Sequence, residues 1–423
     1  MTANKDRRGL DALFRPKSVA VIGASNRRLA IGCRIVRNLQ KMQFRGPVYP
    51  VHPKASHILG LPVYPTILAV PGEVDLAHII VKNTLVPRVL EDCARKGVRV
   101  AIINTDPEVS AYCNFTFTRP RPGHISIFSQ SGGVGEVINN RLCELGEGLR
   151  MYASTGNACD LQCPEVLEYW RDDPETRVII CHLESIEAPD HFAKVAREVS
   201  QKKPILAILT GRTAAGARAV AYHCGGAITG GTGESISRAS GLLPFKSLEE
   251  LCQAARAFVH LPRPPGRRVG IITNTGGPGV IAADELIEAG LELPEPGEAT
   301  QDALRQALYP EAIVSNPVDV LATAGPEHFR AALVAMLGDP QIDSVLLSFV
   351  TPFFVDCEAV AREIVALAAG TPKPIVCVVM TEKTQWSSTL EIFRGAGLPT
   401  FDLPEIGARV LAAMSMYRGQ IAP

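Results

Sequence analysis

His223 stands in a sequence that suits phosphoryl transfer. Two glycines, Gly225 and Gly226, follow it closely and leave room for a large anion beside an imidazole ring. Glu184 comes directly after the apolar run 178–183, and the carboxyl ends of neighbouring parallel strands meet at one edge of a sheet. A carboxylate there could hold one imidazole nitrogen and leave the other free as a nucleophile. We therefore expect His223 and Glu184 to be catalytic residues.

Two alternatives stay open at this position. A histidine in an arbitrary place is usually structural or lies on the surface, and the chain has 9 of them. Cys224 is a rival nucleophile if its thiol were ionised, although free cysteines are mostly buried packing residues.

A second candidate is an anion site in the segment Ser129–Gly135. This segment lies between an apolar strand and a helix that we expect to begin near Val134. Free N–H groups at the positive end of that helix would bind a phosphate. The expected phosphate-binding residues here are Ser131, Gly132 and Gly133, in addition to Gly225 and Gly226. The alternative is an ordinary strand-to-helix turn, because residues 275–277 repeat the same loop.

The first strand of the chain ends in a turn of small residues, and its helix is expected from about Ile31. The turn consists of Gly23, Ala24, Ser25, Asn26 and Arg27, and we expect these residues to bind a cofactor. Such a turn lets backbone N–H groups approach a phosphate, but the full GxGxxG pattern is absent.

Lys54 follows the second strand, where a dinucleotide site would need an acidic residue for the ribose. A cation there favours a phosphorylated ribose, such as the adenosine 3′-phosphate of coenzyme A, and disfavours NAD. The alternative is that Lys54 is only a solvated surface residue.

The elements that must position these residues form three modules. At about 150 residues per domain, 423 residues predict close to three domains. Two proline-rich hinges, Arg119–Gly123 and Leu261–Gly266, separate domains that we place at 1–120, 121–262 and 263–423. In the first domain, short apolar runs alternate with helical patterns, which predicts an α/β fold of the Rossmann-like kind.

The second and third modules are related by an internal repeat. Ile125–Gly135 matches Val269–Gly279 without a gap, and the similarity resumes at Pro204 and Pro374 and again at Gly241 and Gly397. One flavodoxin-like parallel-sheet fold is therefore expected twice. The second module carries about 14 residues more than the third, before Gly241. We expect this insertion to be a glycine-rich loop that holds His223.

The composition narrows the class of protein. Lys plus Arg and Asp plus Glu both total 43, and this balance argues against a nucleic-acid binder or a disordered tail. No run approaches the ~20 apolar residues of a membrane span, no signal peptide is apparent, and no CxxC pair occurs among 11 cysteines. We expect a cytoplasmic protein without a metal site of its own and without membrane or nucleic-acid partners.

Five motifs together resemble the α-subunit half of the nucleoside-diphosphate-forming acyl-CoA synthetases, that is, ADP-forming acetate–CoA ligase and succinate–CoA ligase. The resemblance covers nearly the whole chain. The motifs are Phe14–Ser25, Val48–Lys54, Ser129–Gly133, Tyr222–Ile228 and Ile272–Gly279.

The resemblance implies a CoA-binding domain followed by two flavodoxin-like, succinyl-CoA synthetase-like domains. It implies that an acyl phosphate or ATP phosphorylates His223, that Glu184 supports this residue, and that Ser131 and Gly132 bind the phosphate. The implied CoA contacts are Gly23, Ala24, Ser25 and Lys54.

The resemblance also implies a reaction and a partner. A small carboxylic acid, CoA and ATP give acyl-CoA, ADP and phosphate through an acyl phosphate. An ATP-grasp β subunit would hold Mg-ATP, so this chain alone should not make acyl-CoA, and we expect a hetero- or homo-oligomer.

One departure from the family pattern supports an alternative. Members normally have a further helix and a strand ending in a Gly-Pro-Asn loop after the strand 98–103, but here the hinge follows within about 15 residues, which are too few for both. The alternative is a non-catalytic CoA- or acyl-CoA-binding protein derived from such a ligase. A third reading, an NAD-dependent dehydrogenase, is disfavoured by Lys54.

Overall fold

The computed structural model describes residues 3–28, 30–103, 120–156, 160–224 and 233–421. It forms two compact units. One comprises Met1–Pro120, Phe128–Asn140 and Met151–Asp173, and the other comprises Arg121–Ile127, Arg141–Arg150 and Pro174–Pro423. In the described part of the chain, no helix is both long and apolar enough to span a membrane. The boundaries of the three predicted domains stay a prediction, and the missing Gly-Pro-Asn loop concerns residues 104–119, which lie outside the described residues.

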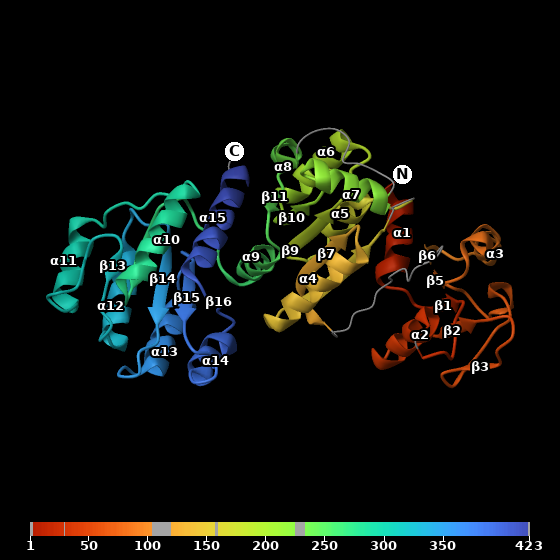
Figure 1. The fold of residues 1–423 in the computed structure, drawn as a ribbon, viewed down its shortest axis with the longest axis horizontal. Coiled ribbons are helices and arrows are strands. Elements are labelled where there is room, and N and C mark those ends of the chain that lie inside the picture. Colours follow the sequence, from red (N-terminus) through yellow and green to blue (C-terminus); the bar gives the residue numbers. More distant parts are fainter. Residues whose placement is uncertain (1–2, 29, 104–119, 157–159, 225–232, 422–423) are drawn as a thin grey trace. The chain divides into compact units, whose positions relative to one another are not determined.

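The first sheet has four parallel strands in the order β2-β1-β5-β6 (Figure 1). The strands are β1 Val19–Ile22, β2 Val48–Val51, β5 Leu76–Ile79 and β6 Val100–Ile103. Helix α2 (Ile31–Lys41) packs on β1 and β2, and α3 (Val86–Lys96) packs on β5 and β6. Both faces are covered because alternate strand residues point to opposite sides: Val19 and Val21 belong to one core, and Ala20 and Ile22 to the other. This agrees with the expected Rossmann-like layout.

Several further elements in this unit were not expected from the sequence. Helix α1 (Ala3–Phe14) precedes β1, and a small antiparallel hairpin of β3 (His57–Ile58) and β4 (Leu61–Pro62) follows β2. Its two turn residues, Leu59 and Gly60, have φ of 49° and 82°, as the tightest hairpin turns require. Single-turn 3₁₀ helices lie at Ile67–Ala69 and Asn83–Leu85.

The second sheet has five strands in the order β11-β10-β9-β7-β8. Its strands are β7 Arg121–Ser129, β8 Gly148–Ser154, β9 Val178–Leu183, β10 Ile205–Leu209 and β11 Leu243–Phe245. The associated helices are α4 Gly132–Glu144, α5 Cys163–Arg171, α6 Pro189–Ser200, α7 Ala214–Cys224, α8 Gly233–Ser240 and α9 Leu248–His260. Residues 121–123, which we expected to be hinge, are the beginning of β7. There Gly123 and Gly148 approach so closely that a Cβ on Gly123 would lie 2.3 Å from the Gly148 backbone.

The third sheet has the order β13-β12-β14-β15-β16. Its strands are β12 Val269–Thr273, β13 Val318–Asp319, β14 Ser344–Val350, β15 Ile375–Met380 and β16 Thr400–Phe401. Its helices are α10 Gly276–Glu288, α11 Glu298–Ala307, α12 Pro326–Gly338, α13 Cys357–Ala368, α14 Ser387–Gly395 and α15 Pro404–Ile421. Helices α10 and α15 pack together and contact β12, β14 and β15, whereas α12 contacts β12 and β14 and packs with α11 and α13 (Figure 1).

The second and third sheets are copies of one fold. Numbered from the first strand of each, both have the order 2-1-3-4-5, which is the flavodoxin-like order. The strand register is also the same: Ile208 pairs with Phe245 in one copy, and its counterpart Val378 pairs with Phe401 in the other. The predicted fold class is therefore confirmed.

The described residues of the longer connection in the second module are largely helical. Between β10 and β11 this connection contains α7 and α8, whereas the connection from β15 to β16 contains α14 alone. Our expectation of a glycine-rich loop is thus wrong for residues 214–224. Alanine accounts for many of the residues of this segment, and alanine is the strongest helix former.

Candidate functional site

The turn after β1 requires glycine at its first position. Gly23 has φ of 90°, and its N–H donates to Val51 O at 3.0 Å. A Cβ on Gly23 would lie 1.9 Å from Ile80 O, and a Cβ on Gly32 would lie 2.3 Å from Gly23 O. These two glycines let the first turn of α2 lie close against the end of β1. That is the arrangement in which backbone N–H groups reach a phosphate.

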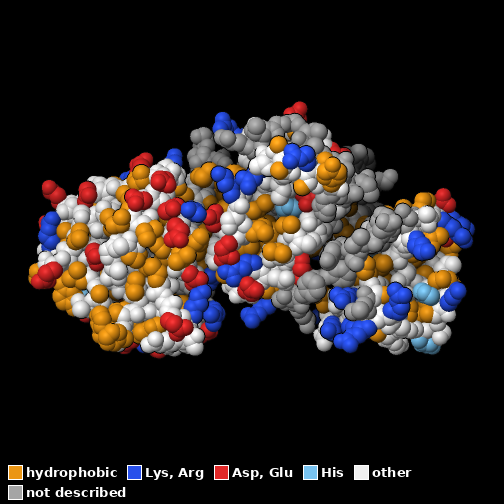
Figure 2. All heavy atoms as spheres, in the orientation of Figure 1, with side chains coloured by type: hydrophobic (Ala, Val, Ile, Leu, Met, Phe, Trp, Pro, Cys, Tyr) orange, Lys and Arg blue, Asp and Glu red, His pale blue; other side chains and the backbone are white. Residues whose placement is uncertain are grey.

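The start of α2 suits an anion. The first turn of this helix contains no acidic residue, and Ser25 Oγ accepts a hydrogen bond from Arg27 N at 3.1 Å. Ala24 is buried, whereas the side chains of Asn26 and Arg27 are exposed. Figure 2 shows Lys and Arg side chains around α2 on the visible face of this unit. The turn therefore has the small residues and the positive potential that a phosphate group needs.

Asn26 is engaged by the protein itself. Its Nδ2 donates to His57 O at 2.9 Å, and its Oδ1 accepts from Leu59 N at 3.1 Å. Gln40 Nε2 also donates to Leu59 O at 3.0 Å. Asn26, which we expected to contact the cofactor, thus holds the β3–β4 hairpin against the turn.

Lys54 lies on the same sheet edge as Gly23. The parallel register of β1 and β2 pairs Ile22 with Val51, so both chains leave the sheet side by side. The Lys54 side chain is exposed, and its backbone N–H donates to His52 Nδ1 at 3.1 Å. Gly23, Ala24, Ser25 and Lys54 are thus gathered at one edge of the first sheet.

His78 lies in β5 of the same sheet and is 6% exposed. Burial lowers its pKa to about 4, so the ring is neutral at physiological pH. A buried neutral ring in a central strand contributes to the core and cannot offer a positive charge to a phosphate.

The loop after β7 forms the predicted helix start, two residues earlier than expected. Helix α4 begins at Gly132, and Ser131 Oγ accepts from Val134 N at 3.4 Å as its cap. Ser129 Oγ donates to Ser131 O at 2.6 Å and accepts from Ser131 N at 3.2 Å. Gly133 is exposed. N–H groups in the first helical turn have no intrahelical acceptor, so those of Gly132 and Gly133 can bind an anion.

The third module has the same loop after β12, with the same side-chain hydrogen bonds. Thr273 Oγ1 donates to Thr275 O at 2.7 Å and accepts from Thr275 N at 3.1 Å. Loop geometry alone therefore does not distinguish a phosphate site from a structural turn. The distinction has to come from residues that the two copies do not share.

Glu184 is such a residue. Ile205 pairs with Ile179, and its counterpart Ile375 pairs with Val345. Ile179 of β9 therefore corresponds to Val345 of β14. Five residues further along each strand, Glu184 of the second module corresponds to Val350 of the third. The catalytic candidate thus belongs to one copy only.

Glu184 is 6% exposed and lies beside a histidine that we did not predict. Its Oε1 lies 3.9 Å from Nε2 of His182, which is 1% exposed. The sequence carried a signal for this pair, because residues two apart on a strand point to the same face. An acidic side chain buried at the carboxyl end of a central strand remains a good candidate for catalysis.

His223 lies in the last turn of α7, two residues before Gly225. Its side chain and that of Cys224 lie outside the described part of the structure, as do Gly225 and Gly226 altogether. The contact between Glu184 and His223 therefore stays a prediction. Within the described ranges, no group of three His, Cys, Asp or Glu residues could hold a metal ion.

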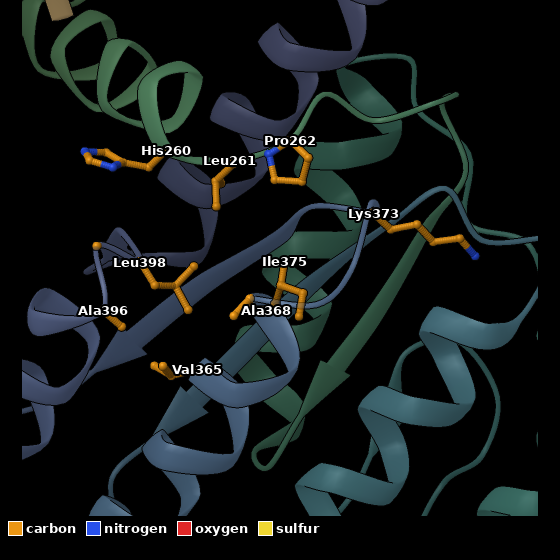
Figure 3. Close-up of a pocket in the computed structure, with 11 residues that line it drawn as sticks. His260, Leu261, Pro262, Val365, Ala368, Lys373, Ile375, Ala396 and Leu398 are labelled. Carbon is orange, nitrogen blue, oxygen red and sulfur yellow. The ribbon is translucent and has the colours of Figure 1, made fainter.

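A small pocket of about 130 Å³ lies near the end of α9 (Figure 3). It is lined by His260, by the ends of α13 and α14, and by Ile375 at the amino end of β15. The side chains of Lys373 and His260 are both engaged, because Lys373 Nζ donates to Asp339 O at 2.7 Å and His260 Nε2 is 2.9 Å from Glu147 Oε1. Helix C-termini repel anions, and chemistry in such folds lies at the carboxyl ends of strands. This pocket is therefore not the phosphate site.

Three family models match consecutive parts of the chain. A CoA binding domain matches residues 17–119, a succinyl-CoA ligase like flavodoxin domain matches 122–258, and a Ligase-CoA domain matches 269–413.

Relatives and solved structures agree with these matches. The chain is 33% identical to the α subunit of ADP-forming acetate–CoA ligase II of Pyrococcus furiosus, over 94% of this chain and 95% of that one. It is 31% identical to ADP-forming acetate–CoA ligase I of Archaeoglobus fulgidus, over 96% of this chain and 64% of that longer one.

A solved acetyl-coenzyme A synthetase from Candidatus Korarchaeum cryptofilum, in complex with phosphate and ADP, is 28% identical with a TM-score of 0.88, over 98% of both chains. The resemblance that the five motifs predict is confirmed, and the chain belongs to the family of ADP-forming acyl-CoA ligases, with the domain content of their α subunits.

Proposed function

We propose that this chain is the α subunit of an ADP-forming ligase that joins a small carboxylic acid to coenzyme A. The acid, CoA and ATP give acyl-CoA, ADP and phosphate through an acyl phosphate, and His223 carries the phosphoryl group between the two half-reactions. The observation that carries the proposal is the difference between the two flavodoxin-like copies. The second module has the longer connection with α7, α8 and His223, whereas the third has a shorter connection. The second module also has Glu184 where the third has Val350.

The first sheet is the proposed CoA-binding site. The start of α2 would hold the pyrophosphate through the turn Gly23–Arg27, and Lys54 would bind the adenosine 3′-phosphate. The close approach of Gly23 and Gly32, the absence of acid from the first turn of α2, and the exposed Lys54 all suit this ligand. A match to the CoA binding domain over residues 17–119 supports the assignment.

The second sheet is the proposed site of the phosphoryl group. The N–H groups of Ser131, Gly132 and Gly133 would stabilise the phosphate on His223, with Gly225 and Gly226 leaving space for it. Glu184 would orient the imidazole so that its other nitrogen attacks phosphorus. In the direction of acyl-CoA synthesis, His223 would take the γ-phosphoryl group of ATP and ADP would leave. The His223 P–N bond would then break as the phosphoryl group passes to the carboxylate of the acid, and the CoA thiol would displace phosphate from the acyl phosphate.

A separate ATP-grasp subunit is the proposed partner, and it would hold Mg-ATP. The longer relative from Archaeoglobus fulgidus supports this, because this chain covers only 64% of its length. The matched relative from Pyrococcus furiosus is named as an α subunit.

The test is phosphorylation of the chain by labelled ATP in the presence of such a subunit. Label on His223 should be stable to base and lost in acid, as phosphohistidine is. The variant His223→Asn should take up no label, and His191→Asn, which changes an exposed histidine on α6, should take up as much as the unaltered chain. Equal labelling of His223→Asn would refute the assignment.

A non-catalytic CoA-binding protein is the second candidate. The alignment with the Pyrococcus furiosus subunit runs over 441 positions, more than the 423 residues of this chain, so that relative has segments that this chain lacks. CoA binding without any phosphorylation would favour this candidate. Acid- and CoA-dependent release of ADP with the partner would exclude it.

A further inference from the structure

The segment His52–Ala55 is held by an unusual arrangement at the end of β2. The ring nitrogen Nδ1 of His52 accepts two backbone hydrogen bonds, from Lys54 N and from Ala55 N, each at 3.1 Å. Pro53 lies between them and has no N–H to donate. One histidine side chain thus closes a turn in the manner of an asparagine or aspartate at the start of a turn.

Both sides of this turn are fixed independently. Before it, the backbone N–H of His52 donates to Tyr64 O at 3.0 Å, next to the paired end of β2. After it, the β3–β4 hairpin is held by Asn26 and by Gln40. The Leu59 backbone is kept at a φ of 49°, which is uncommon for a residue with a side chain. The backbone around Lys54 is therefore preorganised, and the His52 ring orders the turn itself.

We propose that His52 is a positioning residue that sets the direction of Lys54 toward the 3′-phosphate of CoA. The inference rests on the proposed function, because it presupposes that this edge of the sheet binds CoA. Since Nδ1 is the acceptor, the ring proton is on Nε2 in this arrangement. A lysine on an ordered turn loses less conformational freedom when it binds a phosphate than one on a loose loop.

The experiment compares CoA with 3′-dephospho-CoA, which lacks the phosphate that Lys54 would bind. Calorimetry on the full chain measures both dissociation constants. The variant His52→Ala should weaken CoA binding by about three- to tenfold, as expected for the loss of a modest polar contact, and should leave dephospho-CoA within about twofold. Lys54→Ala should also remove the preference for CoA. A second substitution at His52 in that background should cost nothing further, because the two residues act through one contact.

Two controls separate positioning from folding. His52→Asn keeps a side-chain acceptor at the start of the turn and should retain most of the preference for CoA. His191→Ala changes an exposed histidine on α6 and should have no effect. Thermal unfolding of each variant checks that the chain is folded.

The possible failures are distinguishable. If the unaltered chain binds no CoA, the proposed function fails and this inference with it. If it binds both ligands equally well, or if His52→Ala weakens both by the same factor, CoA binding stands and the role of His52 is refuted.

Discussion

At Gly23, the backbone conformation and the surroundings both exclude a side chain. Its φ is 90°, and a Cβ would lie 1.9 Å from a backbone oxygen of β5's end. Gly97, at the end of α3, has a similar φ of 79° but no atom within 4 Å of the corresponding position. A side chain at Gly97 would therefore cause backbone strain alone, whereas a side chain at Gly23 would cause both backbone strain and a steric clash.

We expect Gly23→Ala to destabilise the folded chain by about 2–5 kcal/mol, because strain and overpacking add. Gly97→Ala should cost about 1 kcal/mol from strain alone. Calorimetric unfolding of both variants checks this, together with CoA binding, which only Gly23→Ala should impair. Equal losses of stability would show that the close contact at Gly23 is relieved at no cost.

His78 makes a prediction about pH. Burial lowers its pKa from 6.5 to about 4, so the folded chain binds a proton at this site less readily than the unfolded chain does. Between pH 6.5 and 4 the unfolded state is the more protonated one, and stability from this group is lost as the pH falls through that window, by up to about 3 kcal/mol. The variant His78→Leu should show a shallower fall in unfolding temperature between these pH values. His191→Leu, an exposed control, should keep the original slope.

The turn Gly23–Arg27 could be predicted because small residues after a strand have a direct physical meaning, whereas its contacts with CoA stay a prediction. The role of His52 and of Asn26 could not be predicted. Their side chains bond to backbone groups whose positions depend on the hairpin, and a single sequence does not show that Leu59 adopts a positive φ. The pair of Glu184 with His182 follows from strand periodicity, but the burial of both had to come from the structure.

At the scale of elements, α1 is held by aromatic contacts with α5. The Phe14 ring stacks on Tyr169 with 5.2 Å between centroids and lies 5.8 Å from Trp170. Tyr169 donates to Asp11 Oδ1 at 2.6 Å, and burial together with this carboxylate raises the pKa of Tyr169 to about 12. A helix of this length is marginal by itself, so its stability depends on these contacts.

We expect Phe14→Ala to loosen α1 by about 1 kcal/mol, the worth of an aromatic pair, and to speed amide hydrogen exchange in this helix roughly fivefold. Hydrogen exchange followed by mass spectrometry measures this. Arg95→Ala, which breaks an exposed pair with Asp92 on α3, is the control. Unchanged exchange in α1 would mean that other contacts hold the helix.

Helix and strand boundaries show what local patterns can predict. The strands of the first sheet could be predicted because each is a short, mostly apolar run. Helix α4 begins earlier than expected because Ser131 caps it, so that both glycines belong to the first turn. We expected the insertion to be a loop because of its glycines, but its alanines favour the helix α7.

For the whole molecule, the repeat made the fold predictable without any three-dimensional information. Two segments of one chain with similar sequences in the same order are expected to adopt the same fold, and the shared strand order and register agree. The proposed phosphoryl-transfer site was less predictable, since the proposal depends on the few positions where the two modules differ. Glu184 and the insertion are such positions, and the loop Ser129–Ser131 is not.

The unchanged register on both sides of the insertion has an evolutionary consequence. The segment 210–242 joins the same paired strands as the shorter 381–399, so lengthening it left the sheet as it was. Closing the longer connection costs only about 0.5 kcal/mol more in chain entropy, less than a single hydrogen bond contributes. A duplicated domain could therefore acquire an additional segment at little cost in stability while its sheet kept the same strand pairing.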